Sequence, residues 1–220
     1  MISGMTVLVD YGPQLLKGLC YTLIMAIAGS VLGLVLGFAL AVIRNGGHRL
    51  PNAIIDGYVE IFRGTPLLVQ LFVFYYGGST IGITLNAFIV GLMGLSLYGS
   101  AYFAEIFRAG FESLARGQTE AAISFGFSRW HTLRYVVLPQ ILIMVIPPST
   151  NLMIILLKDT AVLSTITVPE LTFQVTGMTA ETFTFVEPFL VLAAVYWILT
   201  ELTSYLGKYL ERRVGGYLRT

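Results

Sequence analysis

The chain has 220 residues, of which 56% are hydrophobic and only 11% are charged, and its mean hydropathy is +0.80. Soluble domains carry about a quarter charged residues, so these few charges cannot cover the surface of a 24.1 kDa soluble protein. The net charge of +1 offers no basic surface for nucleic acid, and the hydrophobicity excludes a disordered chain. The composition therefore predicts an all-α integral membrane bundle whose surface faces lipid.

Five apolar segments are long enough to cross a bilayer, which takes about 20 residues of helix. The run Gly77–Thr80 separates the second segment from the third because it concentrates glycine, serine and threonine. The expected spans are residues 18–43, 58–76, 84–107, 135–157 and 188–210. With no long linker or repeat, residues 1–220 are expected to form one transmembrane domain.

The first span carries glycines at four-residue intervals, namely Gly29, Gly33 and Gly37. This doubled GxxxG pattern permits close approach of another helix, because small residues let two backbones come together in a membrane. We therefore expect a tight helix–helix contact along this face of the first span.

Basic residues are distributed unevenly between the predicted loops. Eleven of the thirteen lysines and arginines fall around the first and third loops and in the carboxyl-terminal tail, whereas only Lys17 and Lys158 lie on the opposite side. Positive charge accumulates on the cytoplasmic side of membrane proteins. The distribution predicts an amino terminus outside and a carboxyl terminus in the cytoplasm.

Signatures of catalysis, metal binding and nucleotide binding are missing from the sequence. The pair Gly207-Lys208 lacks the upstream glycine of a phosphate-binding loop, and there is no HExxH or GxSxG pattern. Cys20 is the single cysteine, and both histidines fall in predicted cytoplasmic loops. We therefore expect no catalytic residue, no metal and no cofactor in this chain. If it serves ATP-driven transport, the nucleotide binds a partner.

The third predicted loop, on the cytoplasmic side, contains a short helix expected at residues 119–126. Thr119 is a suitable N-cap, Glu120 favours the positive helix start, and Gly126 suits a left-handed end. Ser128 can then cap a second helix that leads into the fourth span. Three aromatic residues flank the turn: Phe125, Phe127 and Trp130. The physical pattern fits equally a rigid knob for a groove on a cytoplasmic partner and an interfacial amphipathic turn.

The spacing of this loop resembles the EAA motif of ABC-importer permeases, EAA-x3-G-x9-I-x-L-P. The matching residues are Glu120-Ala121-Ala122, Gly126 and Leu138-Pro139, with Val136 in place of isoleucine. Three further segments resemble the polar-amino-acid permeases of histidine, glutamine and glutamate uptake systems: Glu60-Ile61-Phe62-Arg63-Gly64-Thr65-Pro66, Tyr102-Phe103-Ala104-Glu105-Ile106-Phe107-Arg108-Ala109-Gly110 and Lys158-Asp159-Thr160-Ala161. The resemblance covers nearly the whole chain.

The resemblance implies a bacterial inner-membrane subunit of an ATP-driven amino-acid importer. Its expected partners are a second permease, identical or paralogous, a cytoplasmic ABC ATPase dimer that holds ATP-Mg, and an extracytoplasmic amino-acid-binding protein. Glu120, Ala121, Ala122 and Gly126 would couple to the ATPase. The alternative is a small secondary transporter, which would carry its own ion site and usually inverted repeats; neither is apparent in the sequence.

Charged residues near the spans are expected to pair at helical spacing, as Glu60 with Arg63 and Glu105 with Arg108. An intramembrane charge costs roughly 2.5–3.5 kcal/mol on insertion scales, so each needs a partner or water.

Five polar residues are candidates for contact with an amino acid: Thr65, Ser100, Asn151, Lys158 and Asp159. Asp159 offers a negative charge to an α-ammonium group, and Asn151 lies about two helical turns before Lys158 on one face. The resemblance places substrate contacts in these same segments. The alternative interpretation is that Lys158 and Asp159 only mark the end of a span at the membrane surface.

Overall fold

The computed structural model describes residues 10–47, 49–80 and 82–217, with the side chains of 116 and 215–217 left out. Within these ranges the chain is helical and has no strand, which confirms the all-α prediction. The helices in chain order are α2 (Gly12–Asn45), α3 (Arg49–Gly64), α4 (Leu67–Phe72), the π-helix η1 (Val73–Gly77), α5 (Gly78–Thr80), α6 (Ala87–Ser113), α7 (Arg116–Ser124), α8 (Arg129–Thr132), the π-helix η2 (Leu133–Val137), α9 (Leu138–Asp159), the 3-10 helix η3 (Thr160–Ile166), α10 (Leu171–Thr182) and α11 (Val186–Tyr217).

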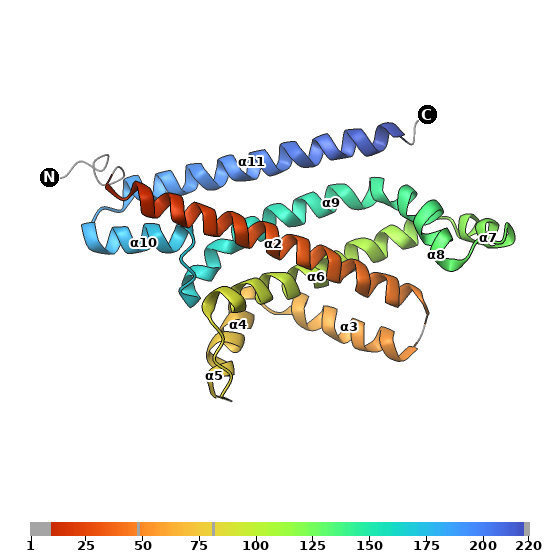
Figure 1. Cartoon of the computed structure of the whole chain (residues 1–220), viewed down its shortest axis with the longest axis horizontal. Coiled ribbons are helices and arrows are strands. Elements are labelled where there is room, and N and C mark those ends of the chain that lie inside the picture. Colours follow the sequence, from red (N-terminus) through yellow and green to blue (C-terminus); the bar gives the residue numbers. More distant parts are fainter. Residues whose placement is uncertain (1–9, 48, 81, 218–220) are drawn as a thin grey trace.

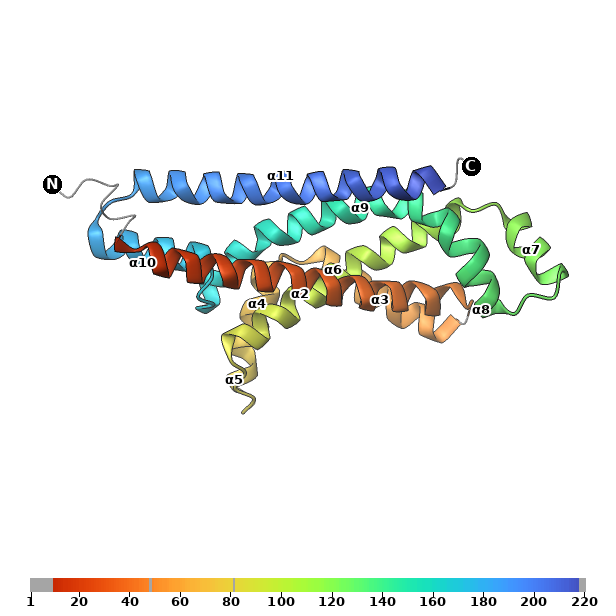
Figure 2. The ribbon, with the colours of Figure 1, turned by 45° about the horizontal axis from the view of Figure 1, so that its top comes forward.

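Four helical segments of the described chain are long and apolar enough to cross a membrane: Gly12–Asn45, Ala87–Ser113, Arg129–Ile166 and Val186–Val214. They contain most of the first, third, fourth and fifth expected spans and continue beyond the predicted carboxyl-terminal ends. α2, α6 and α9 form the packed centre, and α11 runs alongside α9 (Figure 1). α10 lies at one end of the bundle, and α7 and α8 lie at the other (Figure 2).

The second expected span, 58–76, is not one continuous helix. The chain breaks at Thr65 and Pro66, which separate the amphipathic α3 from the short apolar segment Leu67–Thr80. Pro66 ends α3 because its ring removes a backbone donor and disfavours helical geometry in the residue before it. Thr65 and Pro66 thus divide the second expected span, and four helices of the described chain are long and apolar enough to cross a membrane.

Close packing of α2 against α6 organises the core. A Cβ atom added at Gly29 would lie 2.9 Å from the Leu95 Cβ atom, and one at Gly37 would lie 2.5 Å from the Phe103 Cβ atom. At Gly33 the added atom would lie 3.3 Å from the backbone of Gly99. The predicted tight contact along this glycine face is thus confirmed. The buried side chains of Met25, Leu71, Leu95, Phe103, Ile141 and Leu156 fill the space around it.

Candidate functional site

The short helix α7 carries the motif Glu120-Ala121-Ala122 and begins earlier than the sequence predicts. It starts at Arg116, directly after the extended residue Ala115, and no side chain caps it. Thr119 therefore lies inside the helix, and its prediction as an N-cap was wrong. The helix starts as soon as the chain turns out of α6, because the Gln118 N–H group already donates to the Ala115 carbonyl at 3.0 Å.

The end of α7 agrees with the prediction. Gly126 has a φ of +82°, in the left-handed region that favours glycine. The Phe127 N–H group donates back to the Ala122 carbonyl at 3.1 Å, which closes the last turn. Ser128 then caps α8, since its hydroxyl oxygen accepts from the His131 N–H group at 3.3 Å. This turn fixes the angle between α7 and the helix that leads into α9.

Aromatic side chains and a shallow hollow shape the surface of this region, which we call the α7–α8 knob and define as residues 116–132. Phe125 is 85% exposed and Trp130 is 61% exposed, so both project from the knob. The hollow has a volume of about 440 Å³ and is lined by Gln118, Ala121, Ala122, Phe125, Phe127 and Val136. Alanine at 121 and 122 leaves the hollow open. An exposed apolar surface on a rigid projection is typical of a protein-binding site.

Thr65 and Gln70 stabilise the break between α3 and α4. The Thr65 hydroxyl donates to the Ile61 carbonyl at 2.8 Å, and the buried Gln70 amide donates to that hydroxyl at 2.8 Å. The same amide also donates to the carbonyls of Phe62 at 2.9 Å and Thr65 at 3.1 Å. Carbonyls freed by a helix break inside a membrane need such donors. Sequence reasoning did not identify Gln70, although it is a lone amide four residues after a proline.

Ser100 lies fully buried between α6 and α3 rather than at an open surface of this chain. Its hydroxyl is 2.6 Å from the Tyr58 hydroxyl and donates to the Leu97 carbonyl at 2.9 Å. Ser100 therefore joins two helices of the bundle.

The other three candidates lie on α9, and Asp159 is its last residue. Asn151 and Lys158 are exposed and Asp159 is half-buried. In the described part of the chain none of the three side chains makes a hydrogen bond or an ion pair of 4 Å or less. On the neighbouring α6, the Tyr98 hydroxyl donates to the Tyr102 hydroxyl at 3.2 Å. Among the residues that the structure describes, no hydrogen bond links any two of the five candidates.

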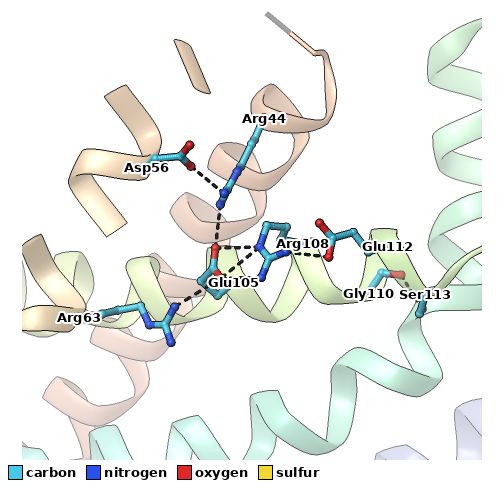
Figure 3. A network of polar contacts seen from close by, with 8 residues as sticks. All are labelled: Arg44, Asp56, Arg63, Glu105, Arg108, Gly110, Glu112 and Ser113. Atoms are coloured by element: carbon cyan, nitrogen blue, oxygen red, sulfur yellow. Dashed lines mark hydrogen bonds and ion pairs between the residues drawn. The ribbon is translucent and has the colours of Figure 1, made fainter. Parts of the chain in front are cut away.

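Glu105 is the centre of an ion-pair network that joins three helices (Figure 3). Its carboxylate accepts from Arg44 on α2 at 2.7 Å and from Arg108 on α6 at 2.9 Å. Arg63 at the end of α3 lies 3.4 Å from the same carboxylate. The predicted pair of Glu105 with Arg108 is confirmed, but the predicted pair of Glu60 with Arg63 was wrong because Arg63 turns to Glu105.

Two further carboxylates complete this network. Asp56 on α3 lies 2.7 Å from Arg44, and Glu112 on α6 lies 2.7 Å from Arg108. Three arginines therefore face three carboxylates, and the cluster is electrically neutral. It fastens both ends of the α3 segment 56–63 to α2 and α6, next to the break at Thr65 and Pro66. The sequence does not reveal it, because the partners are up to 61 residues apart.

The fold and the site together define a helical membrane protein with an exposed, partly apolar projection at one end. The sequence profile described as "Binding-protein-dependent transport system inner membrane component" matches residues 13–216, and the chain belongs to this family. The family resemblance inferred from the EAA spacing is thereby confirmed.

Curated relatives match over nearly their whole length. The probable amino-acid ABC transporter permease protein YckA of Bacillus subtilis (strain 168) is 33% identical over 206 residues, covering 94% of this chain and 91% of that protein. The arginine transport system permease protein ArtQ of the same organism is 31% identical over 203 residues, covering 92% of this chain and 93% of that protein. A crystal structure of an amino acid ABC transporter with histidines is 34% identical, with a TM-score of 0.87 over 97% of this chain and 100% of that chain.

Proposed function

We propose that this chain is the permease subunit of an ATP-driven importer of a polar or charged amino acid. The observation that carries the proposal is the α7–α8 knob, in which Glu120-Ala121-Ala122 and the left-handed Gly126 lie on a rigid projection outside the bundle. The similarity to amino-acid permeases over nearly the whole chain supports the substrate class. A secondary transporter, the alternative, would have no use for such a projection.

The knob suits a cytoplasmic ATPase as its partner. Phe125 and Trp130 project toward solvent, and the hollow beside Ala121 and Ala122 can receive a side chain in return. A dimer of ABC ATPases, which binds ATP-Mg, would dock there and bias the permease between two arrangements. An extracytoplasmic binding protein would deliver the amino acid at the opposite side. The chain itself would hold no nucleotide.

A second permease subunit, identical or paralogous, would complete the translocation path. Asn151 and Lys158 are polar, exposed and without a hydrogen-bonding partner within the described chain, and they lie on an apolar helix. Such groups are costly against lipid, so this face of α9 suits a water-filled or protein-covered surface. The path would then run beside α9 and the Tyr98–Tyr102 face of α6.

Purification of the native complex in mild detergent tests the proposed function. An ABC ATPase chain should co-purify with this protein, and mass spectrometry should identify a bound or delivered amino acid. Proteoliposomes that contain the complex and the binding protein should take up that amino acid only with ATP inside. Uptake driven by an ion gradient, without an ATPase chain, would instead support a secondary transporter.

Asp159 is expected to bind the α-ammonium group of the substrate. Its replacement by asparagine should lower uptake into proteoliposomes by more than about tenfold, because a charge-assisted hydrogen bond of about 1.5–3 kcal/mol is lost. Assembly and basal ATP hydrolysis should persist. Glu187→Gln, an exposed carboxylate in the first turn of α11, is the matched control and should transport normally. Near-normal uptake by Asp159→Asn would place the site elsewhere.

Orientation in the membrane is tested with reporter fusions. We propose that the end with α10 faces outward and the end with α7 faces the cytoplasm, because basic residues concentrate at the latter end. A reporter active only outside the cytoplasm should function at Gly78 or Thr176 and fail at Gly117. Activity at Gly117 would reverse the proposed orientation.

A further inference from the structure

A fully buried carboxylate lies at the end of the bundle opposite the knob. Glu170 precedes α10 and has no exposed surface. Its oxygens accept from the backbone N–H groups of Thr172 at 2.8 Å and Phe173 at 2.7 Å, so it caps α10. Burial raises the pKa of the Glu170 carboxyl, and these hydrogen bonds oppose the rise. No lysine, arginine or histidine of the described chain pairs with it.

Hydroxyl groups from two other elements, α2 and α11, contact Glu170. The Tyr196 hydroxyl on α11 donates to its Oε2 atom at 3.2 Å, and the Thr22 hydroxyl on α2 lies 3.5 Å from the same atom. Thr22 in turn accepts from the Leu171 N–H group at 3.1 Å. Capping of α10 uses only the two backbone N–H groups. The contacts of Glu170 and Leu171 with Thr22 and Tyr196 therefore hold α2 and α11 against α10.

Tyr196 links this cluster to the start of η3. The Thr160 hydroxyl donates its single proton to the Leu157 carbonyl at 2.7 Å, so toward Tyr196 it can only accept. The Tyr196 hydroxyl lies 3.2 Å from both the Thr160 hydroxyl and the Glu170 Oε2 atom and shares its one proton between them. Thr160 directly follows Asp159 and is completely buried. At this point the chain changes from α-helix to the tighter 3-10 helix. Thr160 is the first residue of that tighter turn, so its contact with Tyr196 lies one residue from Asp159.

We propose that Tyr196 and Glu170 are positioning residues that orient Asp159 toward the α-ammonium group of the transported amino acid, acting through Thr160. The inference rests on the proposed function and deepens it. Glu170 holds the Tyr196 hydroxyl, Tyr196 holds Thr160, and Thr160 holds the turn that carries the carboxylate. The substrate does not touch Glu170 or Tyr196.

The competing explanation is that the cluster only anchors α11. That helix needs anchors, because hardly any of its most apolar stretch is buried within the chain. The two explanations predict different effects on the ratio of amino-acid uptake to ATP hydrolysis. Loss of an anchor reduces the amount of functional complex, which lowers uptake and ATP hydrolysis in the same proportion. Loss of a positioning contact lowers uptake per ATP hydrolysed.

The test uses the complete transporter in proteoliposomes, with the binding protein in excess, and measures amino-acid uptake and ATP hydrolysis on the same sample. Tyr196→Phe should lower the number of amino acids imported per ATP by about fivefold, the effect of one lost hydrogen bond. Thr160→Val should do the same. The double variant should lose no more than the more affected single variant, since both substitutions remove the same contact between Tyr196 and Thr160.

Tyr205→Phe is the matched control, because it removes an exposed hydroxyl from the same helix that makes no hydrogen bond in the described chain. It should keep the wild-type ratio. Glu170→Gln retains the size of the cap and should lower the ratio in the same direction as Tyr196→Phe.

An unchanged ratio in Tyr196→Phe, or additive losses in the double variant, would overturn the positioning role and leave the cluster as an anchor. A wild-type complex that hydrolyses ATP but imports no amino acid would overturn the proposed function itself, and the inference with it.

Discussion

Replacement of Gly37 by valine is expected to separate α2 from α6 and to destabilise the whole bundle. A Cβ atom at this position would lie 2.5 Å from the Phe103 Cβ atom and 2.7 Å from the Ser100 carbonyl oxygen. The second of these is backbone and cannot rotate away. Overpacking of this kind costs about 1–3 kcal/mol, which corresponds to a fall in Tm of roughly 2–12 °C for a chain of this size.

The measurement is thermal unfolding of the purified complex, together with the yield of monodisperse protein. Gly57→Val in α3 is the matched control, because an added Cβ atom there meets nothing within 4 Å. It should change the Tm little. An unaltered Tm in Gly37→Val would contradict the central role of the α2–α6 contact, whereas equal losses in both variants would mean that valine itself destabilises these helices.

Replacement of Gly126 by valine should uncouple the permease from its ATPase while leaving the bundle intact. The residue has a φ of +82°, and a residue with a branched Cβ carbon pays about 1–2 kcal/mol or more there. The turn between α7 and α8 would relax to another geometry and move Phe125 relative to Trp130. Substrate-stimulated ATP hydrolysis should fall by about tenfold, measured on the reconstituted complex.

Gly82→Val provides a control with the same local strain. Gly82 has a φ of +80°, also with open space around it, but it lies in the turn before α6 and away from the knob. It should retain stimulated hydrolysis, and both variants should insert into the membrane normally. Full coupling in Gly126→Val would show that the knob does not transmit the ATPase cycle.

Much of the fold follows from local patterns in the sequence. The continuous apolar stretches of α2, α6, α9 and α11 are visible because lipid demands about 20 apolar residues per helix. The glycines at 29, 33 and 37 likewise predict a close helix–helix contact, although they do not indicate that the partner helix is α6. Pro66 marks a break in the second span, but only the tertiary structure shows that the Gln70 amide donates to the backbone carbonyls of Phe62 and Thr65 there.

The candidate site was predicted unevenly for the same reason. Gly126 and Ser128 were predictable, since a left-handed turn and a helix cap depend on residues within three or four positions of one another. Thr119 was not a cap, because the preceding helix ends closer to α7 than its sequence suggests. The contact of Ser100 with Tyr58 joins residues 42 apart, and no local pattern indicates it.

Hydropathy, charge distribution and turn chemistry act over short distances, so local sequence is enough to predict an all-α membrane protein with a short helical motif in one loop. Which polar groups pair depends instead on the tertiary structure. Glu105 lies between arginines of three helices, and Glu170 reaches Tyr196 across 26 residues. In an apolar environment a polar group bonds to whichever partner the packing of the helices brings within reach. That choice depends on how α2, α6 and α9 pack together, which no single segment encodes.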